Sequence, residues 1–163
     1  MTIIKTRALQ MDIKIEEHHG FNEGLAGIIH ALESEIFKEP YTKEKIRRES
    51  SVKPNLITLV ASIHGEPAGY KVGYEMTSRL FYSWIGGVLL KYRGNGIARK
   101  LISHQHAIVK EQGYKIVRTH TENKYREMLL LNIRTGFDVV GVMNDSTKPK
   151  SIIVLDKILG STQ

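Results

Sequence analysis

The chain has 163 residues, of which 41% are hydrophobic and 25% charged, and it carries a formal net charge of +7 with a sequence pI near 9.6. This composition predicts one folded domain over residues 1–163 and excludes a disordered chain. The absence of cysteine excludes disulfide bonds, thiolate metal sites and a cysteine nucleophile, and we expect no metal. No apolar run is long enough to span a membrane and residues 1–10 lack a signal-peptide core, so we expect a cytoplasmic protein with no membrane partner.

The positive charge would suit nucleic acid binding, because basic surfaces attract polyphosphates. However, Lys and Arg are scattered, with only short clusters such as 43–48, and aromatic residues do not alternate with them as a base-stacking surface requires. We therefore favour a solvated basic surface and expect no nucleic-acid partner. A basic protein also suits a strongly anionic small ligand.

The first half of the chain shows helical and extended patterns in turn. Apolar residues at helical spacing follow Asn22, a favourable N-cap, and Pro40 stops the pattern. The turn residues His64 to Pro67 separate two extended runs and predict a hairpin. The expected elements are a strand over 12–16, with 3–7 as an alternative start, a helix between Asn22 and Pro40, a helix over 42–49, and strands over 56–63 and 68–76.

The second half contains the longest extended run, which carries the pair Gly86-Gly87. Glycines inside a strand predict a β-bulge or the close approach of another backbone or a ligand. A bulge there would free N–H and C=O groups that need a partner. The expected elements are strands over 80–90, 115–121, 137–143 and 151–158, a helix over 96–112, and a helix that Asn123 caps and Gly136 ends.

The most informative segment joins the strand over 80–90 to the helix over 96–112 through a glycine turn. Gly94 and Gly96 permit backbone angles that other residues avoid, so that successive N–H groups can converge on an anion. The first turn of the following helix adds unpaired donors and the positive end of the helix dipole, and Arg93 adds a fixed charge. The pattern therefore predicts a phosphate-binding loop.

The spacing of this loop decides between known phosphate sites. It does not contain the G-x-x-x-x-G-K-[ST] pattern of a P-loop, and the dinucleotide pattern G-x-G-x-x-G would require glycine where Arg99 stands. The pattern [QR]-x-x-G-x-[GA] is met by Arg93, Gly96 and Ala98. With this loop, the preceding glycine pair, the amphipathic helix after it and a second helix that ends in Gly136-Phe137, the chain resembles the GNAT superfamily of acyl-CoA-dependent N-acetyltransferases over most of its length.

The resemblance implies a mixed α/β (α+β) fold, with a central, mostly antiparallel twisted sheet of six to seven strands flanked by helices. It also implies that acetyl-CoA is the co-substrate. The loop amides would then bind the CoA pyrophosphate, and the preceding strand would pair with the pantetheine arm at Val88 and Leu90. We expect a freed amide near Leu89 or Leu90 to stabilise the oxyanion. The expected cofactor-binding residues are Val88, Leu89, Leu90, Arg93, Gly94, Asn95, Gly96, Ile97, Ala98 and Asn132.

Acyl transfer from a thioester to an amine poses two proton problems. Deprotonating a lysine-like amine at pH 7.4 costs about 4 kcal/mol, whereas releasing a thiolate from a thiol of pKa near 8.5 costs about 1.5 kcal/mol. The base therefore matters more, and the candidate catalytic residues are His120 and Glu75, with ordered water as an alternative. His104 and His106 are expected to be solvated.

The general acid is where the chain departs from the family pattern. The tyrosine often found four residues before the glycine of the Gly-Phe pair is replaced by Asn132, which has no titrating proton. Asn132 would face inward and could hydrogen-bond the thioester or pantetheine instead. Tyr125 is an alternative acid, although it lies two turns away from the usual position.

These observations predict direct transfer of the acetyl group to a primary amine of an unidentified small molecule or peptide, without a covalent enzyme intermediate. The alternative is a non-catalytic acyl-CoA-binding regulatory module, which the absent tyrosine favours. We expect the first helices and the segment 146–150 to bind the acceptor, and a polycationic acceptor would need an acidic pocket such as Glu33, Glu35 and Glu39. A homodimer is expected by analogy only.

Overall fold

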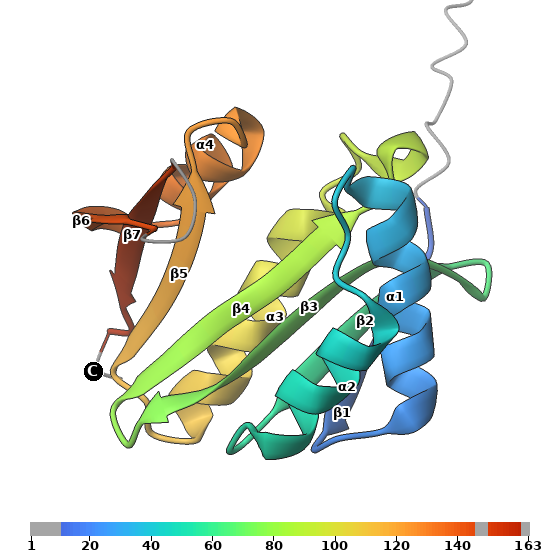
Figure 1. The fold of residues 1–163 in the computed structure, drawn as a ribbon, viewed down its shortest axis with the longest axis horizontal. Coiled ribbons are helices and arrows are strands. Elements are labelled where there is room, and N and C mark those ends of the chain that lie inside the picture. Colours follow the sequence, from blue (N-terminus) through green and yellow to red (C-terminus); the bar gives the residue numbers. More distant parts are fainter. Residues whose placement is uncertain (1–10, 146–149, 161–163) are drawn as a thin grey trace, which may run out of the picture.

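The structure is a computed structural model that describes residues 11–145 and 150–160, and it contains a seven-stranded sheet (Figure 1). The strands are β1 (Ile13–His19), β2 (Ile57–Ile63), β3 (Glu66–Thr77), β4 (Leu80–Val88), β5 (Ile116–Glu122), β6 (Asp138–Asn144) and β7 (Ser151–Ile158). The helices are α1 (Glu23–Ile36), α2 (Lys43–Val52), α3 (Ile97–Glu111) and α4 (Arg126–Arg134), with a 3-10 turn η1 (Leu90–Tyr92) after β4. The alternative first strand over 3–7 lies outside the described residues.

The strand order is β1-β2-β3-β4-β5-β7-β6, and β4–β5 is the parallel pair in an otherwise antiparallel sheet. The prediction of a mostly antiparallel sheet flanked by helices is therefore confirmed. Helices α1 and α2 lie in front of β1–β3 in Figure 1, and α3 lies behind the sheet. We call these two sides the α1 face and the α3 face.

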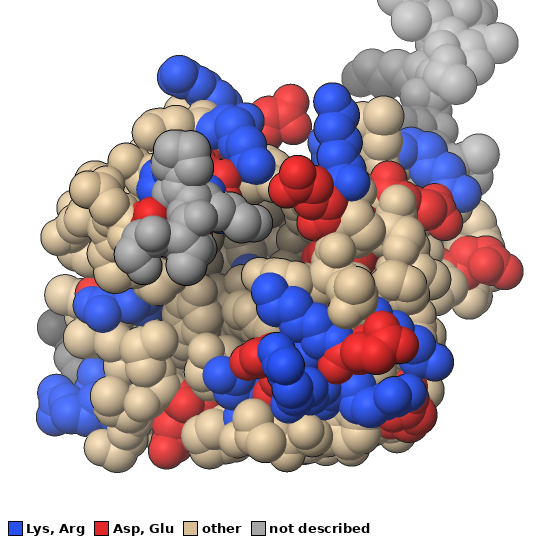
Figure 2. All heavy atoms as spheres, in the orientation of Figure 1, with Lys and Arg blue, Asp and Glu red and all other residues tan. Residues whose placement is uncertain are grey.

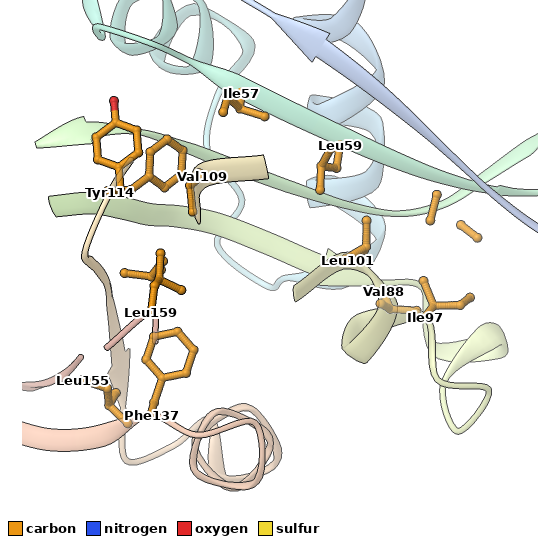
Figure 3. Close-up of a cluster of buried hydrophobic side chains, with 14 of the residues drawn as sticks. Ile57, Leu59, Val88, Ile97, Leu101, Val109, Tyr114, Phe137, Leu155 and Leu159 are labelled. Carbon is orange, nitrogen blue, oxygen red and sulfur yellow. The ribbon is translucent and has the colours of Figure 1, made fainter. Parts of the chain in front are cut away.

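Each face of the sheet has its own hydrophobic core. On the α3 face, Leu101 and Val109 of α3 pack with Ile57, Leu59 and other strand residues, and Figure 3 shows this cluster extending to α4 and β7 through Phe137 and Leu155. On the α1 face, a second core forms from buried residues of both helices and the sheet, namely Ala26, Ile29, Leu32, Ile46, Leu56, Tyr70, Val72 and Leu89. Burying each large apolar side chain contributes about 1.5–3 kcal/mol, so the two cores hold the sheet between its helices.

The termini of the helices follow their capping residues. The Asn22 side chain accepts a hydrogen bond from the Leu25 N–H, which confirms the predicted cap of α1. Helix α4 begins at Arg126, later than predicted, and Asn123 makes no cap for it; Tyr125 precedes it without a side-chain cap. No helix within the described ranges is both long and apolar enough to cross a membrane.

Strands β4 and β5 pair only along part of their length. Leu80 to Ser83 match Ile116 to Thr119, and beyond these residues the strands diverge (Figure 1). The β-bulge in β4 lies at Trp84, between the pairs Val72–Ile85 and Gly73–Ser83. The prediction of a bulge at Gly86-Gly87 is wrong, because both glycines pair in register with Lys71 and Tyr70.

The glycine pair has a packing reason instead of a bulge. A β-carbon on Gly87 would lie 3.0 Å from Ile36 Cδ1 and 3.5 Å from Phe37 Cε2, so the C-terminal end of α1 packs directly on the β4 backbone. A larger residue at this position would push α1 away from the sheet. Strand β4 then ends at Val88, two residues earlier than predicted, because the backbone enters η1.

Candidate active site

The glycine loop between η1 and α3 has the backbone that the sequence predicts. Gly94 and Gly96 both have φ of +79°, a region that disfavours residues with a β-carbon, and Gly96 is the N-cap of α3. A β-carbon at either position would meet no atom within 4 Å, so the requirement for glycine is conformational and not steric. Among the described residues, no hydrogen-bond acceptor meets the backbone N–H groups of 94–98. These donors are available to an anion.

The charges around the loop favour an anion in the same place. The first turn of α3 contains no acidic residue, and the exposed Arg99 and Lys100 lie next to the positive end of the helix dipole. Cations there repel the helix dipole unless a negative group binds between them. The Asn95 side chain donates to the carbonyls of Tyr92 and Arg93, at 3.0 and 3.2 Å, and holds the loop closed on itself.

Arg93 connects the loop to the end of β4. Its Nε donates to the Val88 carbonyl at 3.1 Å, and its Nη1 lies 3.9 Å from Glu127 Oε2 at the start of α4. The Arg93 side chain is 43% exposed and the Glu127 side chain 90% exposed, so this ion pair is weak. The guanidinium is therefore free to turn toward a phosphate from a position beside the loop.

The edge of β4 beyond the bulge has backbone groups without a neighbouring strand. The Leu89 N–H donates to the Ala68 carbonyl of β3 at 2.9 Å, so of the two predicted oxyanion donors, Leu89 and Leu90, the first is already engaged. Because backbone groups alternate in direction along a strand, the N–H and C=O groups of Gly86 and Val88 point away from β3, toward β5. Strand β5 has already diverged there. The open edge thus offers the N–H groups of Gly86 and Val88 and the Gly86 carbonyl, whereas the Val88 carbonyl already accepts from Arg93.

His120 is the first residue of β5 beyond its last pair with β4. Its ring lies 4.9 Å from the Tyr82 ring, centroid to centroid, on the α1 face. Among the described residues neither ring nitrogen has a hydrogen-bond partner, and burial, with a smaller contribution from Arg118, lowers the pKa of His120. The imidazole is therefore neutral, and able to accept a proton, at physiological pH.

The structure places Glu75 at the end of β4 away from the loop, and on the opposite face of the sheet from His120. Glu75 pairs with Phe81 near the start of β4, whereas the loop follows the other end of that strand. Its carboxylate accepts a hydrogen bond of 2.5 Å from the Tyr114 hydroxyl, which in turn accepts one from Asn55. At about 3.3 Å per residue, most of the length of β4 separates Glu75 from the loop. Glu75 thus links the end of β3 to Tyr114 and is not brought together with the loop.

The two acid candidates lie on α4 or just before it. Asn132 is 3% exposed and faces inward, as predicted, although its side-chain amide makes no hydrogen bond within the described residues. Tyr125 is 40% exposed and its ring meets Phe37 edge-on at 6.1 Å, so it bridges the N-terminal end of α4 and the C-terminal end of α1. His106, which we expected to be solvated, is 7% exposed and packs against Phe137.

A row of aromatic rings crosses the α1 face beside His120. The rings contact one another in succession, with centroid distances between 4.9 and 6.1 Å, and all are half-buried; this aromatic row consists of Tyr41, Trp84, Tyr74, Tyr82 and His120. Figure 2 shows that the same face is hollowed in its middle, with the charged side chains of α2 beside the hollow. The row supplies flat apolar surface next to a neutral imidazole.

Glu33, Glu35 and Glu39 do not form the acidic pocket that we considered. Glu33 is 4% exposed and accepts hydrogen bonds from the Tyr70 hydroxyl and the Tyr41 N–H, whereas Glu35 and Glu39 are exposed. Most of the acceptor segment 146–150 lies outside the described residues. In the described part of the chain, no three His, Cys, Asp or Glu side chains are placed to hold a metal ion. Hollows beside β1 contain none of the predicted site residues.

Comparison with known proteins agrees with this arrangement. The family model described as "Acetyltransferase (GNAT) family" matches residues 26–129, well over half of the chain. The chain belongs to the GNAT acetyltransferase family. This membership makes it an acyltransferase whose co-substrate is acetyl-CoA. No curated protein matches its sequence.

Solved GNAT structures share its fold at low sequence identity. The ribosomal-protein-S18-alanine N-acetyltransferase from Escherichia coli has a TM-score of 0.79 at 10% identity, covering 93% of this chain and 96% of that one. Ard1 from Thermoplasma volcanium has a TM-score of 0.75 at 18% identity, covering 91% of this chain and 99% of that one. A GNAT family acetyltransferase from Elizabethkingia anophelis, solved with acetyl-CoA bound, has a TM-score of 0.71 at 20% identity, covering 90% of this chain and 98% of that one.

Sequence reasoning missed two features of this GNAT site. It offered Leu89 as a possible oxyanion donor, one residue out of phase with the outward-facing Val88, because the direction of each N–H depends on the register between β3 and β4, which no local pattern reveals. It also missed Lys71, which the alternation of β3 places on the α3 face opposite Gly86. A lysine in the middle of an otherwise apolar strand is a signal that could have been followed.

Proposed function

We propose that this GNAT protein transfers the acetyl group of acetyl-CoA directly to a primary amine of a small molecule or peptide. One observation carries the proposal: a loop of unpaired amides stands at the end of a strand whose outer edge is also unpaired. An anionic head and an amide-containing arm joined in one ligand would satisfy both sets of groups. CoA has this construction.

The chain would bind CoA through backbone groups first. The amides of Gly94, Asn95, Gly96, Ile97 and Ala98 would hold the pyrophosphate, with Arg93 beside them. The open edge at Val88 would pair with the pantetheine amides, extending the sheet as a short strand does. Leu89 and Leu90 would both contribute packing around the pantetheine arm. Leu89 would do so from the core on the α1 face, where it is buried, and Leu90 from its position next to the loop, where it is 78% exposed. Asn132 would offer its amide from α4.

His120 would act as the general base from the α1 face. Its neutral imidazole would accept a proton from the incoming ammonium, directly or through a water molecule, while the Gly86 N–H would donate to the developing oxyanion. Because its pKa is lowered, the base form persists below pH 6.5, so the activity should rise with pH below neutrality and level off near pH 7.

The acceptor would approach over the aromatic row. The half-buried rings of Tyr82 and Trp84 would pack against the carbon skeleton of the acceptor and direct its amine to His120. Since Glu33 already accepts two hydrogen bonds and does not form an acidic pocket with Glu35 and Glu39, we favour a monoamine or a peptide amine over a polycation.

The loop is tested with glycine variants at the two ends of α3. Gly96→Val forces a β-branched residue to a φ near +79° in the loop. Gly113→Val forces the same residue type to a φ near +94° at the far end of the same helix, which imposes a similar strain. In calorimetric titration with acetyl-CoA, we expect the affinity to fall at least tenfold in the first variant and to stay unchanged in the second. Equal loss in both variants would contradict the loop assignment.

The base is tested by thiol release with a panel of amines. Substituting His120→Gln should lower kcat by about 100-fold, in the usual range for a lost general base, and leave the dissociation constant of acetyl-CoA unchanged. The variant should also lose the acidic limb of the pH profile. An unaltered profile would remove His120 from the mechanism.

The alternative function, an acyl-CoA-binding regulatory module, is favoured by Asn132 at the usual position of the acid tyrosine. It predicts that acetyl-CoA raises the melting temperature without thiol release for any amine in the panel. Turnover of any amine above the rate of spontaneous hydrolysis would exclude it.

The proposal includes a homodimer formed through β6. This edge strand exposes apolar side chains, with Val139, Val140, Val142 and Met143 between 44% and 63% exposed, and Asp138 is its charged residue. Edge strands without protecting charges pair readily with a second strand, and two copies of β6 can pair antiparallel. Light scattering should give a dimer for the wild type and a monomer for Val142→Lys.

A further inference from the structure

Lys71 lies where the open half of β4 meets the α3 face. It is paired with Gly86, whose N–H points into the opening, and a β-carbon built on Gly86 would lie 3.5 Å from Lys71 Cγ. The Cγ of the lysine therefore lies beside Gly86 on the α3 face. Strands lie about 4.8 Å apart, so a four-carbon stem extended along this face is long enough to bring the ammonium to the opening.

The surroundings of Lys71 contain polar atoms but no counter-ion. No Asp or Glu in the described part of the chain pairs with it. Several buried polar atoms on the same face have no hydrogen-bond partner there, namely Ser83 Oγ, Thr121 Oγ1, both side-chain polar atoms of Gln105 and both ring nitrogens of His106. Gln105 Nε2 would lie 2.9 Å from a β-carbon on Gly73, the next residue but one along β3. Unpaired polar atoms this deeply buried indicate a place for a polar ligand.

The charged and titratable groups around Lys71 keep its proton mobile. From α3 it is faced by His106, whose pKa is lowered to about 3 by burial and by the positive charges of Lys157 and Lys71, so that this ring is neutral. Burial lowers the pKa of Lys71 itself to about 8. A thiol has a pKa near 8.5, so proton transfer between an ammonium of this acidity and a thiolate is nearly balanced.

We propose that Lys71 is the general acid that protonates the sulfur of CoA, in the role for which Asn132 has no proton to give. This inference rests on the proposed acetyl transfer. The tetrahedral intermediate collapses by breaking the C–S bond, and the electron pair of that bond goes to sulfur. Sulfur takes a proton from the Lys71 ammonium and leaves as the thiol. The attacking nitrogen loses a second proton to solvent as the amide forms, and solvent also receives the proton that His120 removed from the acceptor ammonium. The neutral Lys71 amine recovers one proton from solvent, so that one proton is released in each turnover.

The arrangement separates the two proton transfers across the sheet. His120 stands on the α1 face, where the amine would arrive, and Lys71 stands on the α3 face, behind Gly86. The thioester carbonyl would lie between them, with its oxygen at the Gly86 N–H. Base and acid on opposite faces cannot neutralise each other, so both can hold the correct protonation state at pH 7.

The test compares Lys71→Met and Lys71→Arg with a control, Lys14→Met, whose exposed lysine lies on the edge strand β1. The readouts are acetyl-CoA affinity, kcat for the best amine of the panel across pH, and the pKa of the thiol of bound CoA, followed by the ultraviolet absorbance of the thiolate. For wild type we expect kcat to fall above about pH 8, because Lys71 must carry its proton.

We expect Lys71→Met to lower kcat by about 100-fold, to keep acetyl-CoA binding, to lose the alkaline limb and to raise the pKa of the bound thiol. Lys71→Arg should be equally slow, because a guanidinium keeps the charge but does not release its proton. Wild-type kinetics and an unmoved thiol pKa in Lys71→Met would overturn the role of Lys71, as would full activity in Lys71→Arg. If the wild type binds acetyl-CoA and acetylates nothing, the proposed function fails before this inference is reached.

Discussion

The two halves of β4 differ in how many neighbours they have. Leu80 to Ser83 lie between β3 and β5, so their backbone groups are paired on both sides. Gly86 to Val88 are paired with β3 alone, and the outward groups of Gly86 and Val88 have no strand beside them. The paired half carries Phe81, which is fully buried in the core on the α3 face, whereas the open half carries the glycine pair.

This difference shows how one strand serves both stability and binding. Backbone groups that lack a partner cost free energy when they are shielded from water, so a sheet normally pairs them. Here the pairing stops at Ser83 and Thr119, and the bulge at Trp84 marks the change. The paired half fixes the position of the open half, which a ligand can then complete.

The largest effect on stability is expected from a substitution at the most closely packed glycine beside the paired half of β4. Gly73 pairs with Ser83, and a β-carbon there would lie 2.3 Å from Phe81 Cε1 and 2.7 Å from the Tyr82 carbonyl oxygen. Because a backbone oxygen cannot move without breaking the ladder, Gly73→Ala should lower the free energy of unfolding by about 3 kcal/mol. Urea denaturation measures this, with Gly141→Ala in β6, where a β-carbon meets nothing within 4 Å, as the control. A loss below about 1 kcal/mol would mean that the paired half is not rigid.

A smaller effect on stability is expected from the protonation of the buried His106 ring, which lies on the α3 face. The pKa of His106 is lowered to about 3 in the folded protein, against about 6.5 unfolded, so between these values the unfolded chain binds a proton that the folded chain does not. Stability is therefore complete above pH 6.5 and falls as the pH drops, by about 2 kcal/mol between pH 7 and pH 5.

Urea denaturation at both pH values tests this, with His106→Leu as the comparison. The variant should lose less stability between the two pH values than the wild type does. Equal losses would show that water reaches the His106 ring, and that the α3 face near the open half is wetter than its burial indicates.

The smallest effect on stability is expected in the open half. A β-carbon on Gly86 would lie 3.1 Å from the Tyr70 carbonyl oxygen and 3.5 Å from Lys71 Cγ, which is tight but less so than the contacts of 2.3 and 2.7 Å at Gly73. Gly86→Ala should therefore change the free energy of unfolding by less than about 1 kcal/mol. Thiol release should nevertheless slow by about tenfold, because the methyl group displaces Lys71 from its position behind the thioester. A variant that is unfolded, or fully active, would remove the contrast between the two halves.

Local patterns account for the parts of this protein that were predicted correctly. The cap of α1 at Asn22, the positive φ of Gly94 and Gly96 and the inward-facing Asn132 each follow from a few adjacent residues. Register accounts for the errors along β4. The bulge at Trp84 and the engaged Leu89 N–H depend on which residues of β3 and β4 face each other, and that is set by contacts between segments.

The sequence by itself determined the conformation of the loop over 93–98, because glycines at two positions and a helix directly after them leave the backbone amides few alternatives. Only the tertiary structure decided which side chains lie on each face of the sheet beside the opening between β4 and β5. His120 reaches the α1 face and Lys71 the α3 face because alternate residues of a strand point to opposite sides of a sheet. That consequence becomes readable only when each strand has found its neighbour and its register.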